Sequence, residues 1–111
     1  MEVVKDKVNS RLKISDDVII TVTRLATLEV RGVAGLDGEV NVFSKIKNNP
    51  PIRITRTDES VSVDVKIKVV GTEKVRRIAG KVQKSVSEKI RTITGIPVSQ
   101  VNVIISGAVF D

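Results

Sequence analysis

The sequence predicts an α+β fold: a two-layer sandwich in which two helices pack on one face of a mixed sheet of about four to five strands. Two patterns carry this prediction. Residues 16–30 and 75–93 repeat apolar residues at the period of a helix, so each helix has a single apolar side. Residues 61–70 alternate apolar and polar residues, as a half-buried strand does. One-sided helices and strands bury these surfaces against each other, and the elements are expected in the order β-α-β-β-β-α-β.

The length and composition of the chain restrict its class. With 111 residues it can form one two-layered core, so we expect a loose segment over residues 1–10 and a single domain over residues 11–111. Cysteine, histidine, tryptophan and tyrosine are absent, which leaves no thiol or imidazole for metal binding or nucleophilic catalysis. We therefore expect no enzyme, no cofactor and no metal site.

The sequence also carries no targeting or membrane-spanning pattern. Its N-terminus alternates charged and apolar residues without an apolar signal segment. No run approaches the roughly 18 apolar residues of a membrane span. The chain is therefore expected to be a cytoplasmic protein.

The first helix is the best defined element. After a short strand over Arg11–Ile14, Ser15 can cap the helix, and Asp16 and Asp17 place negative charge at the positive end of its dipole. Gly32 is predicted to end it. The apolar arc of this helix comprises Val18, Ile19, Val22, Leu25, Ala26 and Val30.

Three residues of this helix break its pattern. Ile20 and Leu28 fall outside the apolar arc, so they are either a contact with another subunit or isolated exposed aliphatics. Glu29 falls inside the arc, near the end where the helix dipole disfavours an anion. We expect its carboxylate to bond to the backbone of Val33–Leu36 or to Arg31, or else to lie in an interface.

The strand segments follow from turn signals and alternation. A short strand is expected over Val33–Leu36, followed by a loop up to Pro51. Residues 52–57 and 60–70 read as a hairpin around Asp58 and Glu59. A final strand is predicted around Val101–Ile105.

The second helix has the more continuous apolar stripe. Thr72 is its expected cap, and Gly95, followed by Pro97, is expected to end it. The stripe consists of Val75, Ile78, Ala79, Val82, Val86, Ile90 and Ile93.

The net charge of +6 favours an anionic partner, either nucleic acid or the inner leaflet of a membrane. On the second helix the basic residues lie opposite the apolar stripe, interrupted only by Glu88; others project from the polar faces of strands. The candidate anion- or partner-binding residues are Arg77, Lys81, Lys84, Arg91, Lys66 and Lys68, with Arg53 beside them. The alternative is an ordinary solvated surface charge.

Several motifs match a known family in the right order, from about residue 11 to residue 107. They are Ile14-Ser15-Asp16-Asp17-Val18-Ile19, Leu28-Glu29-Val30, Gly32-Val33-Ala34-Gly35-Leu36, the strand Val61–Val70, the helical Val82, Gln83 and Val86, Thr94-Gly95-Ile96 and Val101-Asn102-Val103. In these motifs the chain resembles the alkaline-shock or general-stress envelope protein family of mainly Gram-positive bacteria.

This resemblance implies a compact α+β domain without demonstrated catalysis. Some members of the family gather beneath the membrane through a separate membrane-anchor protein and support the envelope under stress, and others are tied to lipid synthesis. The better-known members look acidic, whereas this chain is basic.

The leading hypothesis is a non-enzymatic cytoplasmic protein-interaction module in envelope stress response or homeostasis. It would form a homo-oligomer or dock on a membrane-anchored protein partner, because a terminal strand such as Val101–Ile105 can offer unpaired backbone groups to another chain. The alternative is a nucleic-acid-binding domain that uses the basic face of the second helix.

Overall fold

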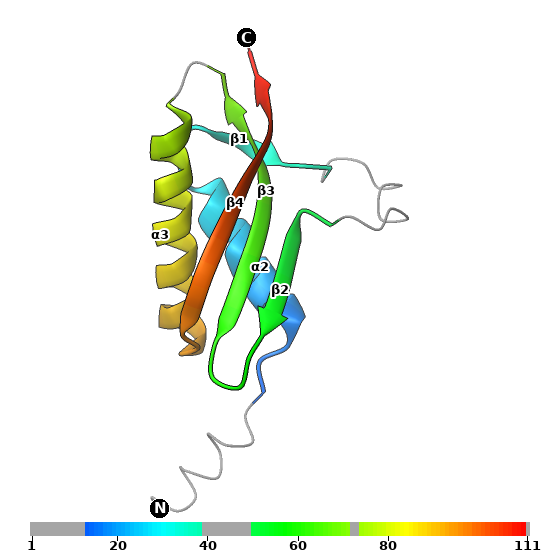
Figure 1. The fold of residues 1–111 in the computed structure, drawn as a ribbon, viewed down its shortest axis with the longest axis vertical. Coiled ribbons are helices and arrows are strands. Elements are labelled where there is room, and N and C mark those ends of the chain that lie inside the picture. Colours follow the sequence, from blue (N-terminus) through cyan, green and yellow to red (C-terminus); the bar gives the residue numbers. More distant parts are fainter. Residues whose placement is uncertain (1–12, 39–49, 72–73, 111) are drawn as a thin grey trace, which may run out of the picture.

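The computed structural model describes residues 13–38, 50–71 and 74–110, and the predicted α+β sandwich is confirmed. Two helices lie against each other on one face of a four-stranded sheet, and no described helix covers the other face (Figure 1). The elements in chain order are α2 (Asp16–Leu28), β1 (Val33–Leu36), β2 (Ile52–Arg56), β3 (Val61–Val70), α3 (Val75–Thr94) and β4 (Val98–Val109). Neither of these helices is long and apolar enough to cross a bilayer.

The strand expected over Arg11–Ile14 is wrong where the structure describes it. Lys13 and Ile14 form no strand, and Arg11 lies outside the described residues. The carbonyl of Ile14 instead accepts a hydrogen bond from the guanidinium of Arg56, because the chain turns here into the cap of α2. The observed order is therefore α-β-β-β-α-β.

The sheet is built around β3. β4 runs parallel to β3 along its whole length, from Val61 opposite Val98 to Val70 opposite Val109. The other edge of β3 is shared by two antiparallel strands, β2 at its start and β1 at its end. The mixed sheet is thus confirmed, with α3 as the crossover that a parallel pair requires.

The core confirms the predicted alternation of β3. The side chains of alternate residues along the strand are buried and face the helices. These residues are Val61, Val63, Val65, Ile67 and Val69. From α3, the buried row that packs against the same core comprises Ile78, Val82, Val86 and Ile90.

The ends of the predicted α3 row are corrected by the structure. Val75 is 43% exposed and Ile93 is 61% exposed. Both lie on the core side of the helix, but α3 has 20 residues and is about 30 Å long, so its two ends extend past the packed region. Thr72, the expected cap, lies outside the described residues, and the residue at the cap position is Lys74.

The structure rotates α2 relative to the predicted arc. Val18 and Leu25 are exposed, whereas Thr23 and Thr27 are buried together with Ile19, Val22 and Ala26. A threonine can occupy the core because its methyl group is apolar; the hydroxyl of Thr23 donates to the carbonyl of Ile19 at 2.7 Å.

The sequence correctly predicts the start of α2 and the end of α3. Ser15 accepts a hydrogen bond from the N–H of Val18, which confirms it as the cap of α2. Gly95 ends α3 with φ of 78°, a left-handed conformation that glycine adopts without strain. The end of α2 was predicted too late. The helix stops at Leu28, and Gly32, with φ of 102°, lies in the turn that follows.

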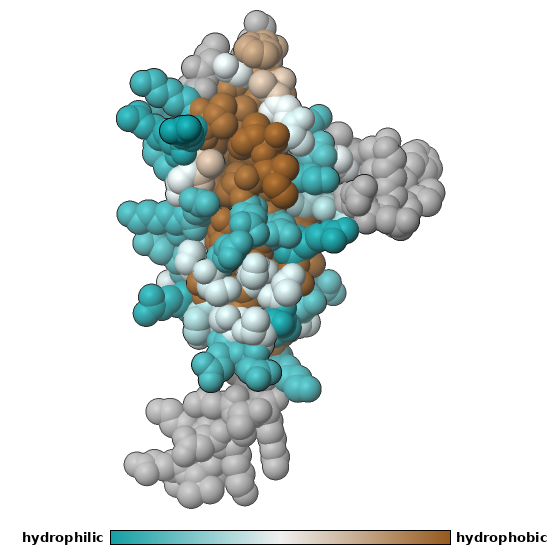
Figure 2. All heavy atoms as spheres, in the orientation of Figure 1, coloured by the Kyte–Doolittle hydropathy of each residue, from teal (hydrophilic) through white to brown (hydrophobic). Residues whose placement is uncertain are grey.

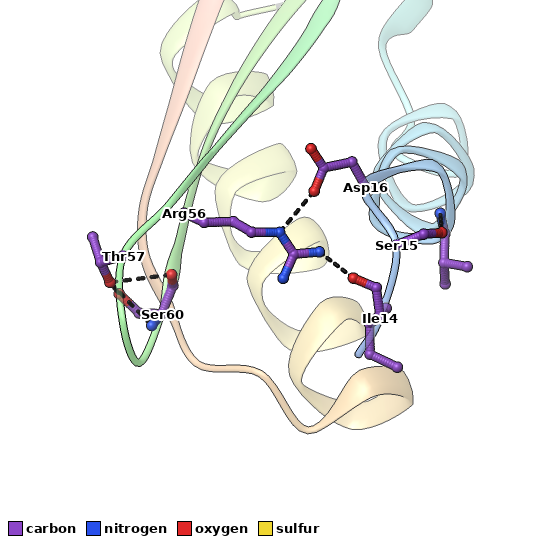
Figure 3. Close-up of polar contacts among 7 residues, drawn as sticks. Ile14, Ser15, Asp16, Arg56, Thr57 and Ser60 are labelled. Atoms are coloured by element: carbon purple, nitrogen blue, oxygen red, sulfur yellow. Dashed lines mark hydrogen bonds and ion pairs between the residues drawn. The ribbon is translucent and has the colours of Figure 1, made fainter. Parts of the chain in front are cut away.

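One polar cluster joins the end of β2 to the start of α2 (Figure 3). Arg56 donates from Nε to a carboxylate oxygen of Asp16 at 2.7 Å and also to the carbonyl of Ile14. Beyond it, Thr57 and Ser60 close the hairpin, the N–H of Thr57 donating to the carbonyl of Ser60 at 2.9 Å. The ion pair is exposed, so its contribution to stability is small.

Two isoleucines on α3 provide a matched test of this core. We expect Ile90→Ala to lower the free energy of unfolding by about 2–5 kcal/mol, because it removes fully buried methyl groups and leaves a cavity. Ile93→Ala makes the same chemical change at the exposed end and should cost less than about 0.5 kcal/mol. Urea unfolding of both variants measures the difference; equal costs would contradict the packing of α3.

Candidate functional site

The outer edge of β4 is the first candidate surface. β4 has 12 residues and pairs with β3 on one side, and no other described strand pairs with it. It contains no charged residue and no proline. Natural sheets usually protect such edges with charges, proline or a short length. The edge of β4 has none of these protections and, apart from the carbonyl of Val101, which the side chain of Gln83 already engages, is suited to receive another strand.

The hydrogen bonds at the two ends of β4 show which of its backbone groups face outward. The side-chain amide of Gln83 on α3 donates to the carbonyl of Val101 at 3.1 Å, so this carbonyl points away from β3. Because the backbone groups of successive residues alternate between the two edges of a strand, the N–H and C=O of Val103 point to the same outer side. The N–H of Gly71 donates to the carbonyl of Val109 at 2.8 Å, so the backbone groups of Val109 face β3. Those of its neighbour Ala108 therefore point outward.

A groove runs between this edge and α3. It has a volume of about 530 Å³ and is lined by residues 98–102 of β4 and by Gly80, Gln83, Lys84 and Ser87 of α3. A Cβ atom added to Gly80 would meet no heavy atom within 4 Å, so the flank of α3 beside β4 is open. The groove leaves room for a further chain next to the edge strand.

The second candidate surface is the basic row of α3, formed by Arg77, Lys81, Lys84 and Arg91. All four side chains are exposed, and their spacing puts them on the side of the helix opposite the buried row. Glu88 lies among them. Within the described ranges, no hydrogen bond or ion pair joins any of the four to another side chain. The row carries four positive charges and one negative charge and is therefore net positive.

The other predicted basic residues lie elsewhere. Lys66 and Lys68 belong to β3 and point to the face of the sheet that the helices leave open, with Arg53 of β2 on the same face. The structure therefore does not bring the six predicted residues together. It divides them between the solvent side of α3 and the open face of the sheet, two surfaces on opposite sides of the fold.

The predicted interface residues also separate. Ile20 is half-buried and packs against the core, whereas Leu28 is exposed. Glu29 pairs with Lys89 of α3 at 3.1 Å, in place of the expected bond to the backbone of Val33–Leu36 or to Arg31. Sequence reasoning missed Lys89 because the pair joins two helices 60 residues apart in the chain. With Arg31, this pair lines a shallow groove of about 350 Å³ between the helices.

The arrangement defines a class of protein: small α+β domains with two helices on one face of a mixed sheet. Solved structures of the MamM CTD share it. A single-substitution variant of the MamM CTD is 14% identical to this chain and has a TM-score of 0.55. The match covers 84% of this chain and 98% of the MamM CTD. A double-substitution variant is 20% identical, covers 82% and 79%, and has a TM-score of 0.57. These likenesses concern the fold alone.

The sequence places the chain more closely. Residues 4–110 match the model of the alkaline shock protein 23 family, described as having a cell envelope-related function, and the chain belongs to that family. An uncharacterised protein of Bacillus subtilis (strain 168), YqhY, is 24% identical over 106 residues, which cover 91% of this chain and 78% of YqhY. The resemblance found in the sequence motifs is thereby confirmed.

Proposed function

We propose that this chain is a non-enzymatic interaction module on the cytoplasmic side of the cell envelope, and that it associates through the outer edge of β4. The family description supports a role at the envelope. The sequence supports a role without catalysis, since it offers no thiol or imidazole. The single observation that carries the proposal is the uncharged, unprotected edge of β4.

A second copy of the chain is the partner that fits this edge best. Two β4 strands can pair antiparallel around a two-fold axis and join their sheets. Because β4 is uncharged, such pairing brings no like charges together along the strands. The α3 flank beside the edge presents Gly80, Gln83, Lys84 and Ser87, and the open space at Gly80 leaves room for the neighbouring copy. A membrane-anchored protein that supplies an extended segment would use the same groups.

Removing outward N–H groups from β4 tests this proposal. We expect the double variant Val103→Pro with Ala108→Pro to be monomeric, because proline takes away two N–H groups that an added strand needs and spares those directed at β3. The control, Val103→Ala with Ala108→Ser, keeps both N–H groups and should associate as the natural chain does. Light scattering measures the mass, about twice the 12.1 kDa of one chain for the associated form.

Circular dichroism shows whether the proline variant is folded, so that loss of association can be assigned to the edge. A natural chain that stays at 12.1 kDa at high concentration, and from which crosslinking captures no partner, would refute the proposal.

A nucleic-acid-binding role is the second candidate, and the net positive charge of the basic row of α3 favours it. We expect a labelled DNA duplex to bind at modest salt and to bind less tightly to the triple variant Arg77→Gln, Lys81→Gln, Lys84→Gln. The slope of log affinity against log salt should become shallower by about 0.9 for each phosphate that the variant no longer neutralises. The control removes three charges from the opposite side of the fold: Arg53→Gln, Lys66→Gln, Lys68→Gln. Equal binding by the natural chain and the α3 variant would remove this candidate.

A further inference from the structure

The open face of the sheet changes character along its length. Near the β2–β3 hairpin the face is polar, with Asp64 accepting a hydrogen bond from Asn102 at 2.7 Å. Toward the C-terminal ends of β3 and β4 it becomes apolar, as Figure 2 shows by the continuous brown area over the upper half of the molecule. We define the apolar patch as Val70, Ile104 and Val109 on the open face, together with Phe110, which follows Val109 at the projecting end of the sheet.

Phe110 is the most exposed member of the patch, at 71%. Its ring rests against the backbone of Gly71. A Cβ atom at Gly71 would lie 2.1 Å from ring carbon Cε1, so a larger residue there would push the ring away. The aromatic ring is therefore held at the projecting end of the sheet, where folding gains little from burying it.

Positive charge surrounds the patch on two sides. Lys66 is opposite Ile104 in the register, and Lys68 is opposite Gly107, so both lysines adjoin the patch on the open face. At the same end of the molecule α3 begins, and its first turn holds Arg76 and Arg77 and no acidic residue (Figure 1). Two acidic residues next to this end in the sequence, Glu73 and Asp111, lie outside the described residues.

Neither feature is explained by the folding of the chain. Arginines at the positive end of a helix dipole lower the stability of the helix. An exposed phenylalanine beside exposed valine and isoleucine lowers the solubility of the protein. Local rules that are broken together at one place point to a binding surface. Its ligand must be apolar in part and anionic in part.

We propose that the apolar patch binds the surface of an anionic lipid bilayer. Apolar side chains at a projecting end, with lysine and arginine around them, are the composition with which peripheral proteins enter the region between headgroups and acyl chains. A second copy does not fit, because a symmetric contact through this face would oppose the lysines of one copy to those of the other. Phe110 projects from the end of the sheet, as a side chain that enters a bilayer does.

This proposal does not rest on association through β4, since the apolar patch and the outer edge of β4 use different groups. The two can therefore fail separately: the proline variant of β4 should still bind lipid, and variants of the patch should still associate.

Sedimentation with lipid vesicles tests the proposal. The natural chain should sediment with vesicles made of equal parts phosphatidylglycerol and phosphatidylcholine and stay in solution with phosphatidylcholine alone. Phe110→Ser with Val109→Ser should weaken binding about tenfold or more, because it removes the apolar side chains that enter the bilayer. Lys66→Gln with Lys68→Gln should weaken it about fivefold for each lysine and reduce its dependence on salt.

The other end of the molecule supplies matched controls. Ile93→Ser removes an aliphatic side chain that is 61% exposed, and Lys13→Gln removes an exposed charge near the end of α3, both far from the patch. Neither variant should change vesicle binding.

A fluorescent reporter shows which end of the molecule enters the bilayer. Since the chain has no tryptophan, Phe110→Trp and Ile93→Trp each introduce a single one. We expect the emission of the first to shift to the blue on addition of anionic vesicles and that of the second to stay unchanged. Absence of vesicle binding, equal loss in the patch and control variants, or a protein crosslinked to position 110 without vesicle binding would overturn the proposal.

Discussion

The structure depends on one strand, because β3 is in contact with every other layer of the fold. Its alternate aliphatic side chains form the floor on which both helices pack, and both of its edges are occupied, one by β4 and the other by β1 and β2 in turn. A strand used in this way has no free edge left for a partner. The surfaces available for function are consequently peripheral: the outer edge of β4, the solvent side of α3 and the open face of the sheet.

Local signals account for the parts of the fold that the sequence predicts well. The bounds of β3 follow from an alternation that needs no knowledge of its neighbours. The same holds for Ser15, whose side chain caps the helix that begins beside it, and for Gly95, whose left-handed backbone ends α3. These features are decided within a few residues of each other.

The parts that the sequence could not predict depend on distant neighbours. The side of α2 that is buried includes Thr23 and Thr27 in place of Val18 and Leu25, because the contact with α3 and the sheet selects the orientation of a helix whose own pattern allows several. For the same reason the sequence does not predict Lys89 as the partner of Glu29, because Lys89 belongs to another helix. It also explains why the basic residues, which form one set in the sequence, belong to two opposite surfaces in the structure.

The parallel pairing of β3 with β4 has a consequence for folding during synthesis of the chain. The hairpin of β2 and β3 can close as soon as both strands exist, but β4 reaches its place only after the whole of α3 has been made. Until then one edge of the valine-rich strand β3 is unpaired, and unpaired edges of this kind are prone to aggregate with other copies of the chain. The crossover helix thus sets a delay in synthesis during which the nascent chain is exposed to misassembly, and the speed at which α3 forms determines how short that delay is.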